Sequence, residues 1–286
     1  TARDFINDLQ RVFQDHEVHE TQKSPIITPV GWALGFALIA ALFAIVWRAP
    51  SDPIKSAQAE DHTLQKQVYD SHHKPTQEEY NAIRRNHPKN MVYIPGGEYI
   101  SGRMNYDAYA PKNEQPTTKV IELKPYLVDI FEYPNKPGAA PLNKVSYEKA
   151  ARLCAEQSKR LCTADEWEKA CKGNFNTIYS YGDTFDIEFC GDGFETVYPS
   201  GQKRECKSTW NTYDMSGNFR EWTNSAPIGQ ESRRFVRGGM QGNAARGTRC
   251  AHKTDESISW TDASLSFRCC RDVDALPITN EPVVAP

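Results

Sequence analysis

The chain has 286 residues, of which 25% are charged and 39% hydrophobic, and its formal net charge is −3. Clustered Lys and Arg are absent from the sequence, so nucleic acid is not expected as a partner. Residues 91–286 are enough for one domain with a sizeable core. The 18 prolines and 17 glycines indicate short elements joined by many turns.

Residues 1–23 are predicted to form a cytoplasmic amphipathic helix. Phe5, Leu9 and Phe13 recur at helical spacing and form an apolar stripe. The opposite face is acidic, whereas a helix lying on anionic lipid normally shows Lys and Arg there. We therefore expect these three side chains to bind a partner protein. A loosely ordered tail is the alternative.

Residues 24–48 are predicted to form a transmembrane helix. The run Val30–Trp47 contains 18 consecutive apolar residues, and a bilayer core about 30 Å thick needs about 20 helical residues. A cleaved signal peptide is the alternative, but the acidic residues before this run make a poor signal n-region. We favour an uncleaved signal anchor.

Residues 49–90 are predicted to be a linker with one short helix. Pro50 and Pro53 end the membrane helix, and Thr76 with Glu79 resembles a capping box that begins the short helix. Four histidines also lie in this linker. No cysteine or regularly spaced carboxylate accompanies them, so we assign no metal site there.

Residues 91–274 are predicted to form the folded domain, and residues 275–286 a C-terminal tail. Residues 91–100 are typical of a strand, a glycine turn and a second strand. Residues 145–154 and 163–171 predict two helices, capped by Ser146 and by a Thr163 capping box. No long periodic segment follows, so we expect loops and short strands.

All eight cysteines lie between Cys154 and Cys270, after the predicted span. An even number of cysteines on one side of a membrane indicates disulfide bonds formed in an oxidising compartment. Basic residues are nearly balanced across the span and do not set its orientation. The cysteines therefore predict a single-pass inner-membrane protein of a bacterium, with a cytoplasmic N-terminus and a periplasmic C-terminal domain.

Four segments occur in an order that resembles the formylglycine-generating enzyme family, also called sulfatase-modifying factors. They are Met91–Gly97, Lys159–Cys171, Tyr213–Thr223, and Arg237–Gly239 together with Ser266–Cys269. The resemblance implies an α+β domain with a C-type-lectin-like fold and little regular secondary structure.

The family enzymes oxidise a substrate cysteine with copper held by two cysteines. The corresponding segment here, Met240–Cys250, has one cysteine at its end, and the spacing of Cys250 from Cys269 is that of a structural cysteine in the family. The two copper positions fall on Met240 and Ala245. Neither residue can supply the thiolate with which the family holds copper, so we expect no copper and assign no catalytic residue.

The resemblance also implies two disulfide bonds, Cys154–Cys269 and Cys171–Cys250. The first pair would bring Cys162 and Cys270 together, which leaves Cys190 with Cys206. The sequence alone does not prove any of these pairings.

A calcium site of the family falls on Asp214, Gly217, Phe219 and Glu221. Two carboxylates and the carbonyls of a glycine-containing turn would suit a hard, oxygen-seeking cation. The alternative is a turn whose acidic side chains are solvated. We expect a structural calcium ion.

These features together predict a non-catalytic, membrane-anchored extracytoplasmic module that serves as an accessory, structural or assembly subunit of a membrane protein complex. One alternative is an oxidoreductase of the same superfamily with non-copper chemistry. The related iron enzymes have a histidine-rich site, whereas His252 is the only histidine in residues 91–286. Another is a lectin-like receptor for peptide or glycan, with Arg237, Arg246 and Arg249 lining the old active-site cleft.

Overall fold

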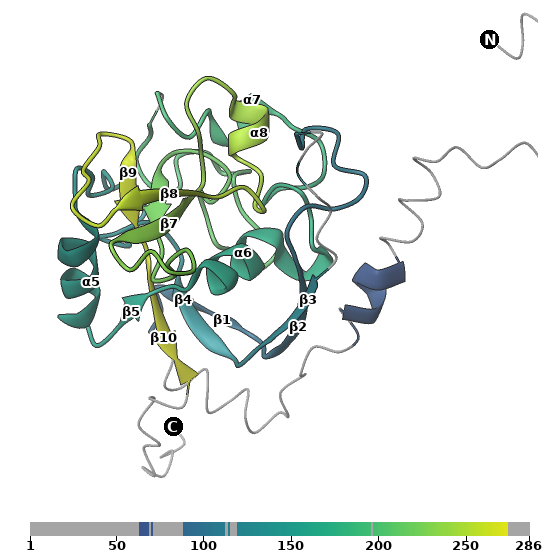
Figure 1. Ribbon diagram of the computed structural model, residues 1–286, viewed down its shortest axis with the longest axis horizontal. Coiled ribbons are helices and arrows are strands. Elements are labelled where there is room, and N and C mark those ends of the chain that lie inside the picture. The colour runs from purple at the N-terminus through teal and green to yellow at the C-terminus, as the bar shows by residue number, and fades with distance from the viewer. Residues whose placement is uncertain are drawn as a thin grey trace, which may run out of the picture. The chain divides into compact units, whose positions relative to one another are not determined.

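The computed structural model describes residues 63–68, 70, 88–111, 114, 119–195 and 197–273 (Figure 1). All of them belong to one compact unit, Ile54–Pro286. The predicted N-terminal helix, the run Val30–Trp47, the helix expected from Thr76 and the C-terminal tail lie outside these residues. Within the described ranges, no helix is long and apolar enough to cross a membrane.

One four-stranded antiparallel sheet has the order β1-β4-β10-β5 (Figure 1). Its strands are β1 (Met91–Ile94), β4 (Tyr126–Asp129), β10 (Cys269–Asp272) and β5 (Arg160–Leu161). All four residues of β4 are buried, so other parts of the domain cover both faces of the sheet at this strand. The last strand, β10, lies between β4 and β5, so it occupies an inner position of this sheet.

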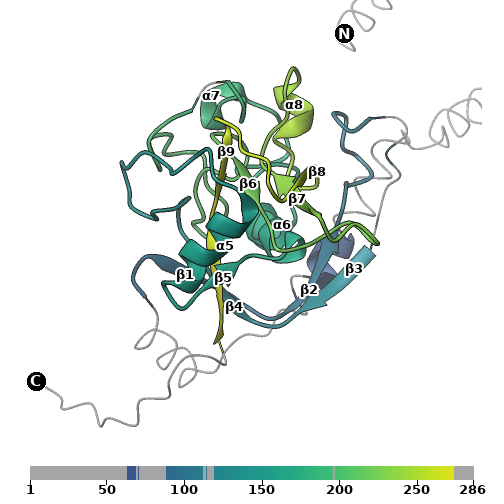
Figure 2. The same cartoon turned by 60° about the vertical axis from the view of Figure 1, so that its left-hand side comes forward.

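A second four-stranded sheet has the order β8-β7-β6-β9, and a two-stranded sheet pairs β2 with β3 (Figure 2). Their strands are β2 (Gly97–Ser101), β3 (Lys119–Leu123), β6 (Arg220–Trp222), β7 (Arg233–Arg237), β8 (Thr254–Ser257) and β9 (Leu265–Phe267). The predicted second strand is confirmed as β2, although it pairs with β3 and not with β1. β9 and β10 are separated only by Arg268, where the chain passes from one four-stranded sheet to the other.

Two nine-residue helices form where the capping patterns predict them. In α5 (Tyr147–Ala155), the Ser146 side chain accepts a hydrogen bond from the Lys149 backbone. In α6 (Ala164–Lys172), Thr163 and Glu166 form the reciprocal capping box. The later helical segments are short: η1 (Gly173–Phe175), α7 (Ile187–Cys190) and α8 (Ala244–Gly247). The expectation of little regular structure after Lys172 is therefore confirmed.

The core has one group of buried side chains around each of two tryptophans. Trp167 of α6 packs with Ile94, Tyr126 and Val128 of the first sheet. Trp222 of β6 lies in the second group, which also holds apolar residues of α5 and β9. Both tryptophans are completely buried, and their indole N–H groups donate to Glu221 and to the Val145 carbonyl.

Four disulfide bonds connect the elements, and they are the four pairs expected from the sequence. They are Cys154–Cys269, Cys162–Cys270, Cys171–Cys250 and Cys190–Cys206. The first two attach the neighbouring cysteines of β10 to α5 and to the residue after β5. No cysteine is left as a free thiol.

A short helical segment from the predicted linker, residues 63–68, packs against the domain. Val68 is buried in a third cluster with Ile100, Met104 and Tyr179. Leu64, four residues earlier and so on the same helical face, packs against this cluster. Part of the segment assigned to the linker therefore contributes to the folded unit.

Candidate functional site

Met240 and Ala245, the positions at which the copper cysteines of the family would fall, lie in the segment that follows β7. Tyr179 donates a hydrogen bond to the Ala245 carbonyl with an O–O distance of 2.5 Å. The Met240 side chain packs so closely on Gly247 of α8 that a β-carbon at Gly247 would overlap it. A thioether and a methyl group occupy the two positions. With all eight cysteines in disulfides, this segment offers no thiolate for Cu(I).

The Arg-Gly-Gly motif before this segment has a packing role. A β-carbon at Gly239 would overlap the backbone of Gly193. Gly238 has a φ of +97°, and a β-carbon there would lie only 2.8 Å from the Phe219 carbonyl oxygen. These glycines allow three backbone segments to meet where larger residues would separate them.

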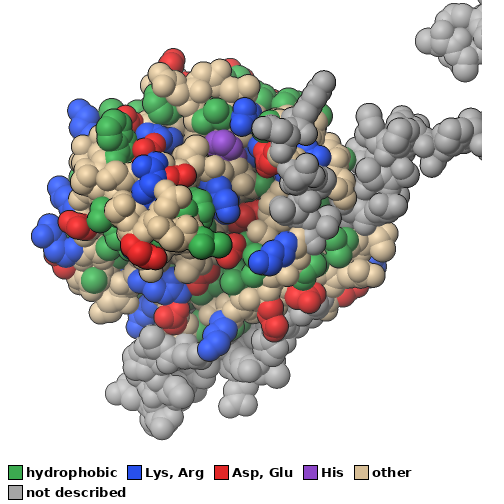
Figure 3. Space-filling view, viewed as in Figure 1, with side chains coloured by type: hydrophobic (Ala, Val, Ile, Leu, Met, Phe, Trp, Pro, Cys, Tyr) green, Lys and Arg blue, Asp and Glu red, His purple; other side chains and the backbone are tan. Residues whose placement is uncertain are grey.

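A cleft of about 620 Å³ opens beside α8 and the residues that follow it. We call it the basic cleft. Its lining comes from the ends of β2 and β3, from α6 and from residues 246–253, and comprises Ser101, Gly102, Pro111, Glu114, Lys119, Ile121, Asp165, Glu168, Arg246, Ala251, His252 and Lys253. Figure 3 shows one face of the molecule with Lys and Arg in blue and a histidine in purple.

Two of the three carboxylates in the basic cleft are neutralised by cations that do not line it. Glu168 forms ion pairs of 2.9 Å with both Lys172 and Arg237. These neighbours lower its pKa against the opposing effect of burial. Glu114 forms an ion pair of 2.7 Å with Arg249. The third, Asp165, accepts a hydrogen bond of 2.9 Å from the Tyr99 hydroxyl.

His252 is nine-tenths buried in the wall of the basic cleft, and its Nε2 has no hydrogen-bond partner among the described residues. Burial lowers its pKa to about 4, and the nearby guanidinium groups of Arg249, Arg246 and Arg237 act in the same direction. His252 is therefore a neutral imidazole at pH 7 in a positive environment.

The arginines proposed to line the old active-site cleft separate into two groups. Arg246 does line the basic cleft. Arg237 and Arg249 are buried, with exposures of 1% and 0%, and are absent from its lining. Their interpretation as cleft residues is wrong because both guanidinium groups are buried and paired with a carboxylate, Glu168 for Arg237 and Asp107 for Arg249.

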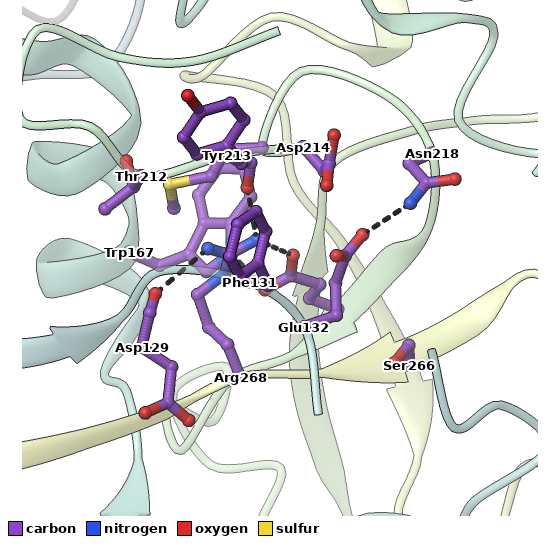
Figure 4. Close-up of polar contacts among 12 residues, drawn as sticks. Asp129, Phe131, Glu132, Trp167, Thr212, Tyr213, Asp214, Asn218, Ser266 and Arg268 are labelled. Atoms are coloured by element: carbon purple, nitrogen blue, oxygen red, sulfur yellow. Dashed lines mark hydrogen bonds and ion pairs between the residues drawn. The ribbon is translucent and has the colours of Figure 1, made fainter. Parts of the chain in front are cut away.

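A buried ion pair lies at the crossing between the two four-stranded sheets (Figure 4). Arg268 Nε and Nη2 donate to the two carboxylate oxygens of Glu221, each over 2.7 Å. Its remaining donors reach the carbonyls of Asp129, Ile130 and Tyr213. Every nitrogen of this completely buried guanidinium has a partner, as a buried charge requires.

Asp214 and Glu132 add two more carboxylates near this pair. Asp214 Oδ2 accepts from the Gly201 backbone at 2.6 Å. Burial and the charge of Glu221 raise the pKa of Asp214 to about 7, although the Gly201 hydrogen bond and Arg268 oppose the shift. Glu132 accepts from Asn218 (Figure 4) and from Ser200. Burial and the nearby Asp214 charge raise the pKa of Glu132 well above the usual range.

The expected calcium ligands do not form a ready coordination shell in this arrangement. Both oxygens of Glu221 are bonded to Arg268, and one also accepts from Trp167. Among the described residues, no group of three or more acidic, histidine or cysteine side chains is placed to hold a metal ion. A cation would therefore compete with a guanidinium for Glu221, and calcium binding stays a prediction.

Sequence reasoning missed several residues of both regions. Arg268 was predicted only as part of the segment Ser266–Cys269. No role was predicted for Glu132, Lys119, Lys253 or Asp165. An arginine between two short apolar strands was a usable signal, because a charge buried there needs a carboxylate partner. The remaining residues come from four separate chain segments, and no spacing rule connects them.

Comparison with known protein sequences finds a matching family model and two curated relatives. Residues 133–273 match the model of the sulfatase-modifying factor enzyme 1-like domain. Two curated relatives are both named inactive C-alpha-formylglycine-generating enzyme 2. The Mus musculus protein is 24% identical over 63% of this chain and 84% of its own length. The Bos taurus protein is 29% identical over 65% of this chain and 71% of its own length.

Solved structures support the same fold. The structure of PvdO from Pseudomonas aeruginosa superposes with a TM-score of 0.54 at 17% identity, over 64% of this chain and 94% of that one. Treponema denticola variable protein 1 gives 0.50 at 17% identity, over 63% and 94%. Residues 133–273 of this chain are thus similar to the sulfatase-modifying factor enzyme 1-like domain, and the chain shares its α+β fold with these proteins.

Proposed function

We propose that this protein is a non-catalytic, membrane-anchored extracytoplasmic module that acts as an accessory or assembly subunit of a membrane complex. The observation that carries the non-catalytic part is the chemistry at Met240 and Ala245. Neither side chain can supply a thiolate, and all eight cysteines are used in disulfides. The names of the two curated relatives, which describe inactive enzymes, support the same proposal.

The membrane-anchored part of the proposal is supported by the sequence before the domain. Val30–Trp47 has the length and composition of a single span. Anchoring needs nothing more, so the stripe of Phe5, Leu9 and Phe13 before it is best explained by burial against another protein. Disulfide bonds in the domain are consistent with a periplasmic location.

An assay of cysteine oxidation tests the non-catalytic part. The full chain in neutral detergent is incubated with a cysteine-containing sulfatase peptide, with and without copper, and the peptide mass is followed. We expect no conversion to formylglycine. The double variant Met240→Cys, Ala245→Cys is assayed in parallel, because it has a thiol at each of the two positions where the family enzymes hold copper. Turnover by the unaltered chain above the no-enzyme rate would contradict the proposal.

Co-purification tests the accessory role. Burying one large apolar side chain contributes about 1.5–3 kcal/mol, so changing Phe5, Leu9 and Phe13 to Ser should release partner proteins while membrane insertion persists. A control variant changes Asp4, Asp8 and Asp15 on the opposite face to Ser. Equal recovery of partners by the two variants would show that the stripe is not the docking surface.

A further inference from the structure

We propose that the basic cleft binds an oxyanion group, a carboxylate, phosphate or sulfate carried by a small molecule, through Arg246, Lys253 and Lys119. This inference does not depend on the accessory role. The volume of about 620 Å³ is within the range of about 300–1,000 Å³ typical of small-molecule sites.

The charges around the basic cleft carry the proposal. Glu168 and Glu114 are already paired with Lys172, Arg237 and Arg249, so they cannot neutralise the lining cations. No ion pair is found for Arg246, Lys253 or Lys119 within the part of the chain that the structure describes. Three cations therefore face one uncompensated carboxylate, Asp165.

Lys119 and Lys253 are exposed, but two buried nitrogens distinguish the wall of the basic cleft from an ordinary solvated basic surface. Arg246 Nε is buried without a hydrogen-bond partner among the described residues, and so is Nε2 of His252. A buried polar nitrogen without a partner costs free energy, whereas an exposed one is satisfied by water. An oxyanion at this wall of the cleft would supply acceptors where the described residues supply none.

The side chains suit an oxyanion better than another kind of ligand. A guanidinium presents a planar set of donors that matches the oxygens of carboxylate or phosphate. Lys253 Nζ lies 4.5 Å from the centre of the Phe235 ring, so part of the lysine is held by packing. Burial lowers its pKa, and Arg237 acts in the same direction, so a nearby anion would favour its charged form.

Calorimetric titration of the full chain in neutral detergent tests the proposal. The probes are inorganic phosphate, inorganic sulfate and glutarate, in a chloride buffer of matched ionic strength, and the probe bound most tightly identifies the oxyanion. A hydrogen bond to a charged group contributes about 1.5–3 kcal/mol, so Arg246→Gln should weaken binding of that probe at least about 10-fold. Lys253→Gln should weaken it similarly.

Asp165→Asn is the decisive second variant, because it removes the opposing negative charge and should tighten binding. An unfolded protein cannot give this gain. Lys149→Gln on α5 removes an exposed charge outside the cleft lining and serves as the matched control. The proposal is overturned if none of the three probes binds beyond the effect of chloride. Equal affinities for the unaltered chain, Arg246→Gln and Asp165→Asn would overturn it as well.

Discussion

Arg268 and Glu221 face each other with both side chains at 0% exposure, joined by two hydrogen bonds of 2.7 Å. Glu221 lies in β6, and Arg268 lies between β9 and β10. The pair therefore connects the middle of one four-stranded sheet to the point where the chain enters the other. Trp167 of α6 also donates to Glu221, so three parts of the core meet at this carboxylate.

Replacing Arg268 with Met should destabilise the domain by about 3–5 kcal/mol, because it leaves a buried carboxylate without its cation. Urea unfolding followed by tryptophan fluorescence measures the change. The matched control is Arg152→Gln, which breaks the exposed Arg152–Glu156 pair on α5 and should change stability by less than about 1 kcal/mol. Similar costs for both variants would show that the buried pair has no special role.

The disulfide pairs should differ in their contribution to stability. Cys154–Cys269 spans 115 residues and Cys190–Cys206 spans 16. In the chain-entropy model these loops correspond to about 5 and about 3 kcal/mol. All four cysteines are buried to a similar degree, so the paired Ala variants can be compared directly. The measurement is the free energy of unfolding of the variant Cys154→Ala, Cys269→Ala and of the variant Cys190→Ala, Cys206→Ala. A larger loss of stability on removing Cys190–Cys206 would contradict the entropic explanation.

His252 should make stability fall as the pH falls. Burial and the guanidinium groups of Arg249, Arg246 and Arg237 lower its pKa in the folded state to about 4, from an ordinary value of about 6.5. Its contribution is fully present above about pH 6.5 and is lost toward pH 4, by up to about 2 kcal/mol at pH 5. The measurement is urea unfolding at pH 8 and pH 5 in chloride buffer.

The comparison variant for this pH effect is His252→Gln, which stays neutral throughout. The difference in unfolding free energy between the unaltered chain and His252→Gln should change by up to about 2 kcal/mol between the two pH values. Other titrating groups are common to both proteins and cancel. Parallel pH profiles would mean that the pKa of His252 is not lowered in the folded state.

Calcium, if bound through Asp214, should raise the melting temperature of the full chain, and chelation should lower it. A ligand at a hundredfold excess over its dissociation constant stabilises the folded state by about 2.7 kcal/mol. The variant Asp214→Asn should reduce this response. Asn tolerates the φ of +63° at this position, and Glu221 keeps its pair with Arg268. An undiminished calcium response in Asp214→Asn would place the ion elsewhere.

The sequence by itself determined the features that depend on neighbouring residues. Ser146 and Thr163 predict the starts of α5 and α6, because capping joins a side chain to a backbone group only three residues away. The ordered motifs predicted the fold, and the missing cysteines at positions 240 and 245 predicted the loss of copper ligands. The family likeness implied Cys154–Cys269 and Cys171–Cys250, whereas the other four cysteines could still join in three ways, and the tertiary structure shows Cys162–Cys270 and Cys190–Cys206.

Only the tertiary structure decided which charges are neutralised inside the protein. Arg237, Arg246 and Arg249 are equivalent in the sequence, yet two are buried against carboxylates and one lines the basic cleft. The carboxylates that make this difference, Glu168 and Asp107, lie tens of residues away in the chain. A charge acts through space and through its degree of burial, so its role emerges only when distant segments have been brought together.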